Sequence, residues 1–153
     1  MSIPSEAADL VFECFVDAPS DLTTFVEICE MSERAFLDKE RLYRISVVML
    51  CILVCEREDS RFADLRKRYE EIVYGIAYKS SGEEFLRSSA NAIEDFQILL
   101  ASSSTNVSWA REWFAEIGVD ITNVVRMGIF VMIWLDLFYY TTKALREIRD
   151  TSP

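Results

Sequence analysis

Apolar residues recur every three or four positions through most of this chain, which is the spacing of an amphipathic helix. Near the start, Ala7, Leu10, Val11, Cys14 and Phe15 share one helix face, and acidic residues lie between them. Comparable patterns predict helices over about residues 5–16, 21–32, 38–58, 61–78, 83–101, 107–117 and 120–149. The second and third patterns are nearly continuous, so the sequence predicts six or seven helices.

Two of these segments are apolar on nearly every face, about residues 42–56 and 124–139. Such helices are typical of the centre of a bundle, with amphipathic helices packed around them. The apolar run from Ile45 to Cys55 is about half the length of a membrane span, which favours a buried core helix. We therefore expect an all-α fold, a single helical domain over residues 1–153 built around these two apolar helices.

Turn signals are few, because the chain has four glycines and three prolines. The segment Lys79-Ser-Ser-Gly82 is the clearest loop. Gly118 is placed to end the helix that begins near Val107, and Asp120 is placed to cap the last helix. This scarcity of turn formers argues against a β-sandwich or a β-barrel.

The net charge is −10, and most of it lies in the first third of the chain. Residues 1–40, the acidic N-terminal helical pair, hold ten acidic and two basic side chains. The negative electrostatic field of this segment repels nucleic-acid phosphate and attracts basic proteins. The hypothesis is that Glu27, Glu30 and Glu33 contact a basic protein partner, with no direct binding to nucleic acid. The alternative is that the charge only keeps the protein in solution.

The sequence lacks histidine, which excludes Ser-His-Asp and Cys-His catalytic sites and zinc sites that need imidazole. No glycine-rich phosphate loop occurs either. Four cysteines lie in apolar stretches without an export signal before them, so we expect reduced, buried thiols in a cytoplasmic protein (Cys14, Cys29, Cys51 and Cys55). We predict no catalytic residues, no cofactor and no metal, and therefore a protein that is not an enzyme.

Two charged residues interrupt the apolar part of the last helix. Arg126 and Asp136 are ten residues apart, too far along one helix to pair with each other. The sequence therefore predicts two buried charges, each paired with another helix or lying at the rim of the core. The alternative is that they line a pocket or a partner groove.

Trp109 and Trp113 lie one turn apart on a short helix that is otherwise mostly polar. Tryptophan is enriched where proteins bind tightly to one another, so the pair is predicted to anchor a partner protein. The alternative is that both rings cover the core.

No motif in the chain resembles that of a known family. The leading hypothesis is a non-enzymatic, acidic, helical binding protein: an inhibitor, an immunity-type protein or an adaptor for a basic partner. The second is a helical scaffold or homo-oligomer subunit, since a mean hydropathy of +0.12 is high for so acidic a chain. The third is a membrane-associated helical protein, which Arg126 and Asp136 disfavour because each is costly in lipid.

Overall fold

A computed structural model describes residues 3–17, 34–79, 82–101, 107–119 and 122–152 of the chain. These residues form six α-helices, one π-helical turn and one 3₁₀ turn. In chain order they are α1 (Ala7–Phe12), η1 (Glu13–Asp17), α3 (Arg34–Glu58), η2 (Ser60–Phe62), α4 (Ala63–Lys79), α5 (Glu83–Ala101), α6 (Val107–Glu116) and α7 (Val124–Thr151). No strand forms in these ranges, so the predicted all-α helical bundle is confirmed.

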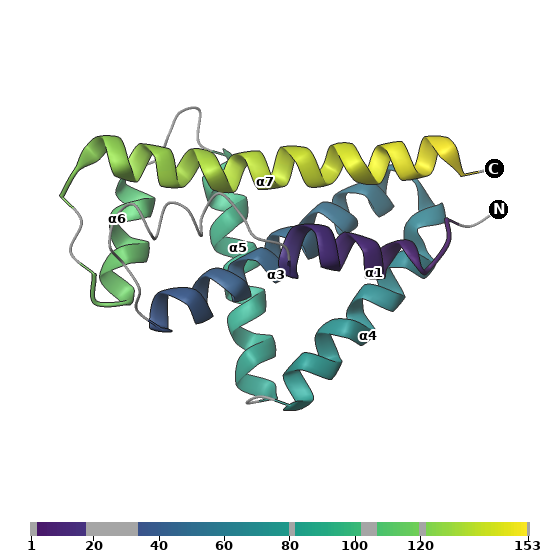
Figure 1. Cartoon of the computed structure of the whole chain (residues 1–153), viewed down its shortest axis with the longest axis horizontal. Coiled ribbons are helices and arrows are strands. Elements are labelled where there is room, and N and C mark those ends of the chain that lie inside the picture. The colour runs from purple at the N-terminus through teal and green to yellow at the C-terminus, as the bar shows by residue number, and fades with distance from the viewer. Residues whose placement is uncertain (1–2, 18–33, 80–81, 102–106, 120–121, 153) are drawn as a thin grey trace.

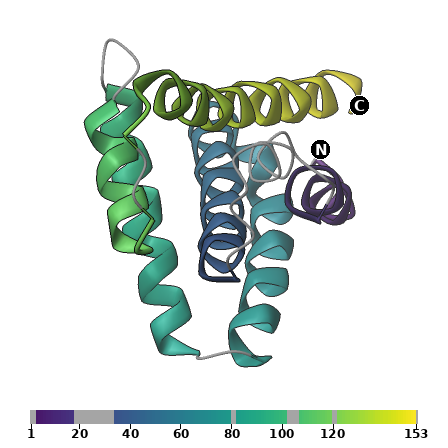
Figure 2. The same ribbon diagram turned by 60° about the vertical axis from the view of Figure 1, so that its left-hand side comes forward.

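Helix α3 lies in the middle of the bundle. It packs against α5 on one side, against α7 along another, and against α1 and α4. Figure 1 shows α4 and α5 forming a V, and Figure 2 shows α3 between its two arms with α7 across the top. The apolar run at the centre of α3 is almost fully buried, from Ile45 to Ile52, as its all-round hydrophobicity predicts.

Helix α7 differs from the prediction for residues 124–139. Its buried side chains follow a single stripe, Met127, Phe130, Val131 and Trp134, which faces the rest of the bundle. The opposite face is exposed although it is apolar: Val125 is 70% exposed and Met132 is 55% exposed. A helix that packs along only one side buries only one stripe, so α7 lies at the edge of the bundle.

An aromatic cluster joins α3, α6 and α7. The ring of Phe130 lies 4.6 Å from Phe114 and 4.9 Å from Trp113, measured between centroids. Trp134 and Phe36 complete the cluster and are fully buried. Each large aromatic ring buries a large apolar surface, so this cluster holds the short helix α6 against α3 and α7.

Local signals set several helix ends. The side chain of Asp59 accepts a hydrogen bond from the amide of Arg61 and starts η2. Gly118 has a φ of +76° after α6, so the predicted glycine end is confirmed. Asn123 caps α7 by accepting from the amide of Arg126, in place of the predicted Asp120, which lies outside the described residues.

Candidate functional site

A hollow surface runs between α3 and α5 and continues to α6. It consists of three adjoining clefts of about 420, 450 and 120 Å³, each sharing lining residues with the next. We call this surface the acidic groove. Its charged lining residues are Asp38, Lys39, Arg41, Glu84, Asp95, Glu112 and Glu116.

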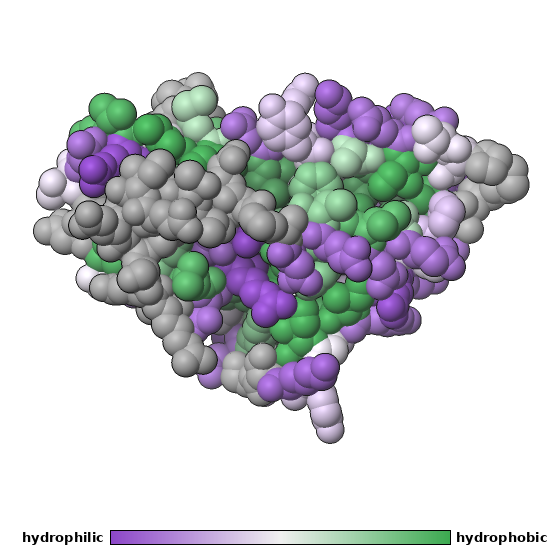
Figure 3. All heavy atoms as spheres, in the orientation of Figure 1, coloured by the Kyte–Doolittle hydropathy of each residue, from purple (hydrophilic) through white to green (hydrophobic). Residues whose placement is uncertain are grey.

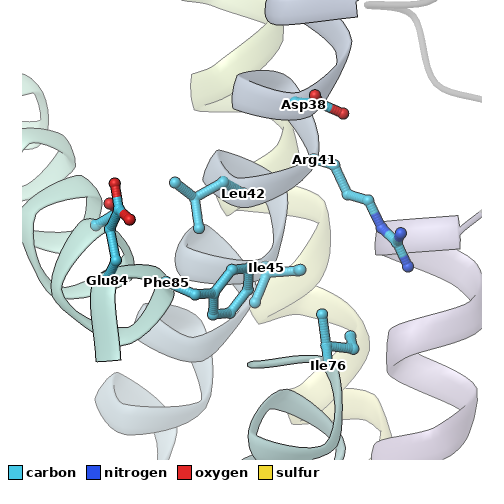
Figure 4. A pocket seen from close by; sticks show the side chains of 8 residues that line it. Asp38, Arg41, Leu42, Ile45, Ile76, Glu84 and Phe85 are labelled. Carbon is cyan, nitrogen blue, oxygen red and sulfur yellow. The ribbon is translucent and has the colours of Figure 1, made fainter. Parts of the chain in front are cut away.

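The first cleft has an apolar floor. Phe85 from α5, Ile45 from α3 and Ile76 from α4 point toward one another beneath it (Figure 4). Leu42 lies on the same face of α3, one turn before Ile45. Apolar floors with a few polar groups at the edge are typical of binding sites.

Carboxylates outnumber cations along the groove by five to two. Both cations already have acidic partners. Lys39 forms an ion pair with Glu116, and the guanidinium of Arg41 lies 3.5 Å from the carboxylate of Asp17. Glu84 and Glu112 have no ion-pair partner within the described ranges. The groove therefore presents a net negative charge to an approaching molecule.

The α6 end of the groove combines aromatic rings with carboxylates. The ammonium nitrogen of Lys39 lies 5.0 Å from the centre of the Trp113 ring and 5.8 Å from that of Tyr43. The hydroxyl of Tyr43 donates a hydrogen bond of 2.9 Å to Asp95. Burial, together with the Asp95 carboxylate, raises the pKa of Tyr43 far above its usual range, so this hydroxyl remains a donor.

Trp109 and Trp113 are both buried, so they are not an exposed anchor. Their rings pack against Phe130 of α7 and Tyr43 of α3, which is the alternative that the sequence left open. Glu27, Glu30 and Glu33 lie outside the described residues, so their proposed contact with a basic partner stays a prediction.

The prediction that Arg126 and Asp136 are buried is wrong, since both side chains are exposed. Arg126 lies in the first turn of α7, and Asp136 lies on the outward face between Met132 and Tyr140. Because that face does not contact the rest of the bundle, neither charge needs a partner from another helix. Neither residue lines the acidic groove.

The cysteine prediction holds only in part. Cys51 and Cys55 are buried in α3, and burial raises the pKa of Cys55 to about 11 and that of Cys51 further. Cys14, which lies in η1, is exposed, contrary to expectation. Cys29 lies outside the described residues. In the described part of the chain, no three potential ligands from among Cys, Asp and Glu gather where they could hold a metal ion.

A second exposed surface covers the first half of α7. Figure 3 shows hydrophobic residues gathered over that end of the helix and hydrophilic ones along its C-terminal half. The exposed apolar residues of this half are Val124, Val125, Ile129 and Met132, and Tyr139 and Tyr140 follow just beyond it. Among the described helices, α7 is also the one that has the length and hydropathy to cross a membrane, although core helices of soluble proteins meet the same criterion.

Sequence reasoning missed the acidic groove. Its α5 side is a stripe of polar residues at four- and three-residue spacing, Glu84, Ser88, Asn91 and Asp95. Glu112 and Glu116 repeat one turn apart on α6. These regular stripes are visible in the sequence, but a polar stripe is also the ordinary solvent face of a helix. Only the packing of α3 beside them makes a groove.

Comparison of the chain with protein-family models, with curated proteins and with solved structures gives no match.

Proposed function

We propose that this protein is a non-enzymatic binding protein that holds a basic segment of a protein partner in the acidic groove. The observation that carries the proposal is the groove itself, whose first cleft has an apolar floor and whose full length is lined by five carboxylates and two cations that are already paired. A partner with lysine or arginine beside apolar side chains matches both features. An inhibitor, an immunity-type protein or a cytoplasmic adaptor would act in this way.

The charge of the groove would act mainly on the rate of association. A negative surface steers a basic protein toward it over a distance of about 10 Å at moderate salt, while burial of apolar side chains slows dissociation. Glu84 and Glu112 are suited to this role because neither is used in an ion pair within the described ranges. Glu27, Glu30 and Glu33 lie outside the described residues and add to the net charge of −10.

Selection from a displayed library of random peptides tests this function with a defined readout. We expect the wild-type protein to select peptides rich in lysine and arginine with interspersed apolar residues. The variant Glu84→Gln/Glu112→Gln should bind the selected peptides at least about tenfold more weakly. A matched control is Glu83→Gln/Glu94→Gln, which removes the same charge from exposed positions of α5 outside the groove. Neutral selected peptides, or equal weakening in both variants, would contradict the proposal.

The exposed apolar surface of α7 favours a second candidate, a scaffold or homo-oligomer subunit. Contiguous exposed apolar residues such as Val125, Ile129 and Met132 are uncommon on monomeric proteins. Sedimentation equilibrium separates the two candidates, because a homo-oligomer gains mass with concentration and Met132→Glu would abolish that gain. A mass that stays monomeric at all concentrations would remove this candidate.

A further inference from the structure

The cleft of about 120 Å³ at the α6 end of the groove has an unusual lining. Three aromatic side chains, Tyr43, Trp109 and Trp113, contribute to it. Asp95, Glu112 and Glu116 supply three carboxylates, and Ile98 completes the lining. Aromatic faces and carboxylates attract the same kind of group, a cation, by their quadrupoles and by their charge.

The chain already places one of its own cations beside this cleft. The ammonium of Lys39 lies near the faces of Trp113 and Tyr43 while it pairs with Glu116. Lys39 lines the neighbouring cleft and not this one, so its ammonium lies on the side of the two rings that faces that cleft. The arrangement shows that these rings accept a positively charged neighbour.

Two groups in the cleft have no hydrogen-bond or ion-pair partner within the described residues. Glu112 has no cation partner within the described ranges, and Asp95 accepts a hydrogen bond from the neutral hydroxyl of Tyr43. The indole N–H of Trp113, whose side chain is 2% exposed, has no hydrogen-bond acceptor in the described part of the chain. A basic side chain of a peptide would supply the cation that Glu112 lacks.

We propose that this cleft is a subsite for a single arginine side chain of the partner. The inference rests on the proposed function and specifies which residue type the α6 end of the groove selects. Arginine suits the site better than lysine because a planar guanidinium pairs with a carboxylate such as that of Glu112 through two hydrogen bonds. A lysine of this chain already occupies the adjacent position, and a guanidinium approaches Glu112 and Asp95 from the open side.

The test adds N-acetyl-arginine amide, or its neutral isostere N-acetyl-citrulline amide, to ¹⁵N-labelled protein. Binding is monitored by NMR through the chemical shifts of the indole N–H resonances. We expect the arginine compound to shift the resonances of Trp109 and Trp113 with a dissociation constant on the order of millimolar. The citrulline compound should leave them unchanged, because it has the same shape without the charge. Equal shifts with both compounds, or none with either, would overturn the subsite.

Two exposed or partly exposed positions give matched variants. Glu112→Gln should raise the dissociation constant about threefold, while Glu83→Gln should leave it unchanged. Lys39→Met should lower it by a similar factor, because a competing positive charge is removed and Glu116 is released. If the dissociation constant is the same in Glu112→Gln and Lys39→Met as in the wild type, the arginine binds elsewhere and the subsite is wrong.

The two experiments distinguish a failure of the arginine subsite from a failure of the proposed function. If the selected peptides bind through Glu84 but N-acetyl-arginine amide leaves both indoles unchanged, the groove binds its partner without an arginine subsite. If the arginine compound binds and no basic peptide is selected, the arginine subsite is supported and the proposed function of the groove is wrong.

Discussion

The hydroxyl of Tyr43 on α3 donates a hydrogen bond of 2.9 Å to the carboxylate of Asp95 on α5, and this contact joins the two helices that form the acidic groove. Tyr43 also packs its ring against Trp109 and Trp113 of α6. One side chain therefore fixes three helices relative to one another at the narrow end of the groove. A groove held in this way is already shaped before a partner arrives, which lowers the entropy cost of binding.

Replacing Tyr43 with phenylalanine tests this contact. Tyr43→Phe removes the donor and keeps the ring, so we expect the free energy of unfolding to fall by about 1 kcal/mol. Urea denaturation measures the change. Tyr78→Phe is the control, since Tyr78 is 91% exposed and the change there should have no effect. An unchanged stability in Tyr43→Phe would mean that the hydrogen bond contributes nothing.

The aromatic cluster around Phe130 should be the most sensitive part of the core. Phe130→Ala leaves a cavity between Trp113, Phe114 and Trp134, and should lower the free energy of unfolding by about 3–5 kcal/mol. The neighbouring substitution Ile129→Ala, on the exposed face of α7, should cost well under about 1 kcal/mol. Similar losses at the two positions would contradict the packing of α7 along one face.

Thiol reactivity distinguishes Cys14 from the cysteines of α3. In a Cys29→Ser background, a disulfide reagent at pH 8 should modify Cys14 in the folded protein and reach Cys51 and Cys55 only after unfolding. Burial hides both thiols, and the raised pKa of each keeps the reactive thiolate scarce. Modification of all three cysteines in the folded protein would show that the centre of α3 is accessible.

Stability should fall at alkaline pH. Burial raises the pKa of Tyr69 and Cys51 well above their usual values, and that of Cys55 to about 11. Above about pH 9 the unfolded chain therefore releases protons that the folded chain retains, so the free energy of unfolding declines as the pH rises. Below that pH the contribution of these groups is fully present.

Urea midpoints measured between pH 8 and pH 10.5 under reducing conditions would show this decline. Tyrosinate absorbance provides the matching control, because Tyr43 and Tyr69 should ionise only as the protein unfolds. Ionisation of all six tyrosines in the folded protein would contradict the burial of these two.

The helices were predictable because their boundaries depend on local chemistry. Glu83–Ala101 matches the predicted range, and Gly118 ends α6 as expected, since a positive φ is easy only for glycine. The cap of α7 was harder to predict, because asparagine and aspartate are equally good acceptors at this position and Asn123, not the predicted Asp120, caps the helix.

Tertiary relationships were harder to predict. The first part of α7 is apolar on nearly every face, which indicated that the helix is buried. Whether both of its faces are covered depends on how many helices pack against it. That uncertainty explains the error at Arg126 and Asp136, which lie exposed on α7. The groove was missed for the same reason, because Glu84 and Asp95 become a binding edge only beside α3.

The central claim is that the acidic groove binds a basic protein, and an affinity capture from the native lysate tests it most directly. Wild-type protein, Glu84→Gln/Glu112→Gln and the control Glu83→Gln/Glu94→Gln would each be used at low and high salt, with the bound proteins identified by mass spectrometry. The account predicts one basic protein in stoichiometric amount, retained by wild type and control, released by salt and absent from the groove variant. Recovery of only its own copies at either salt, or equal capture by the groove variant, would contradict it.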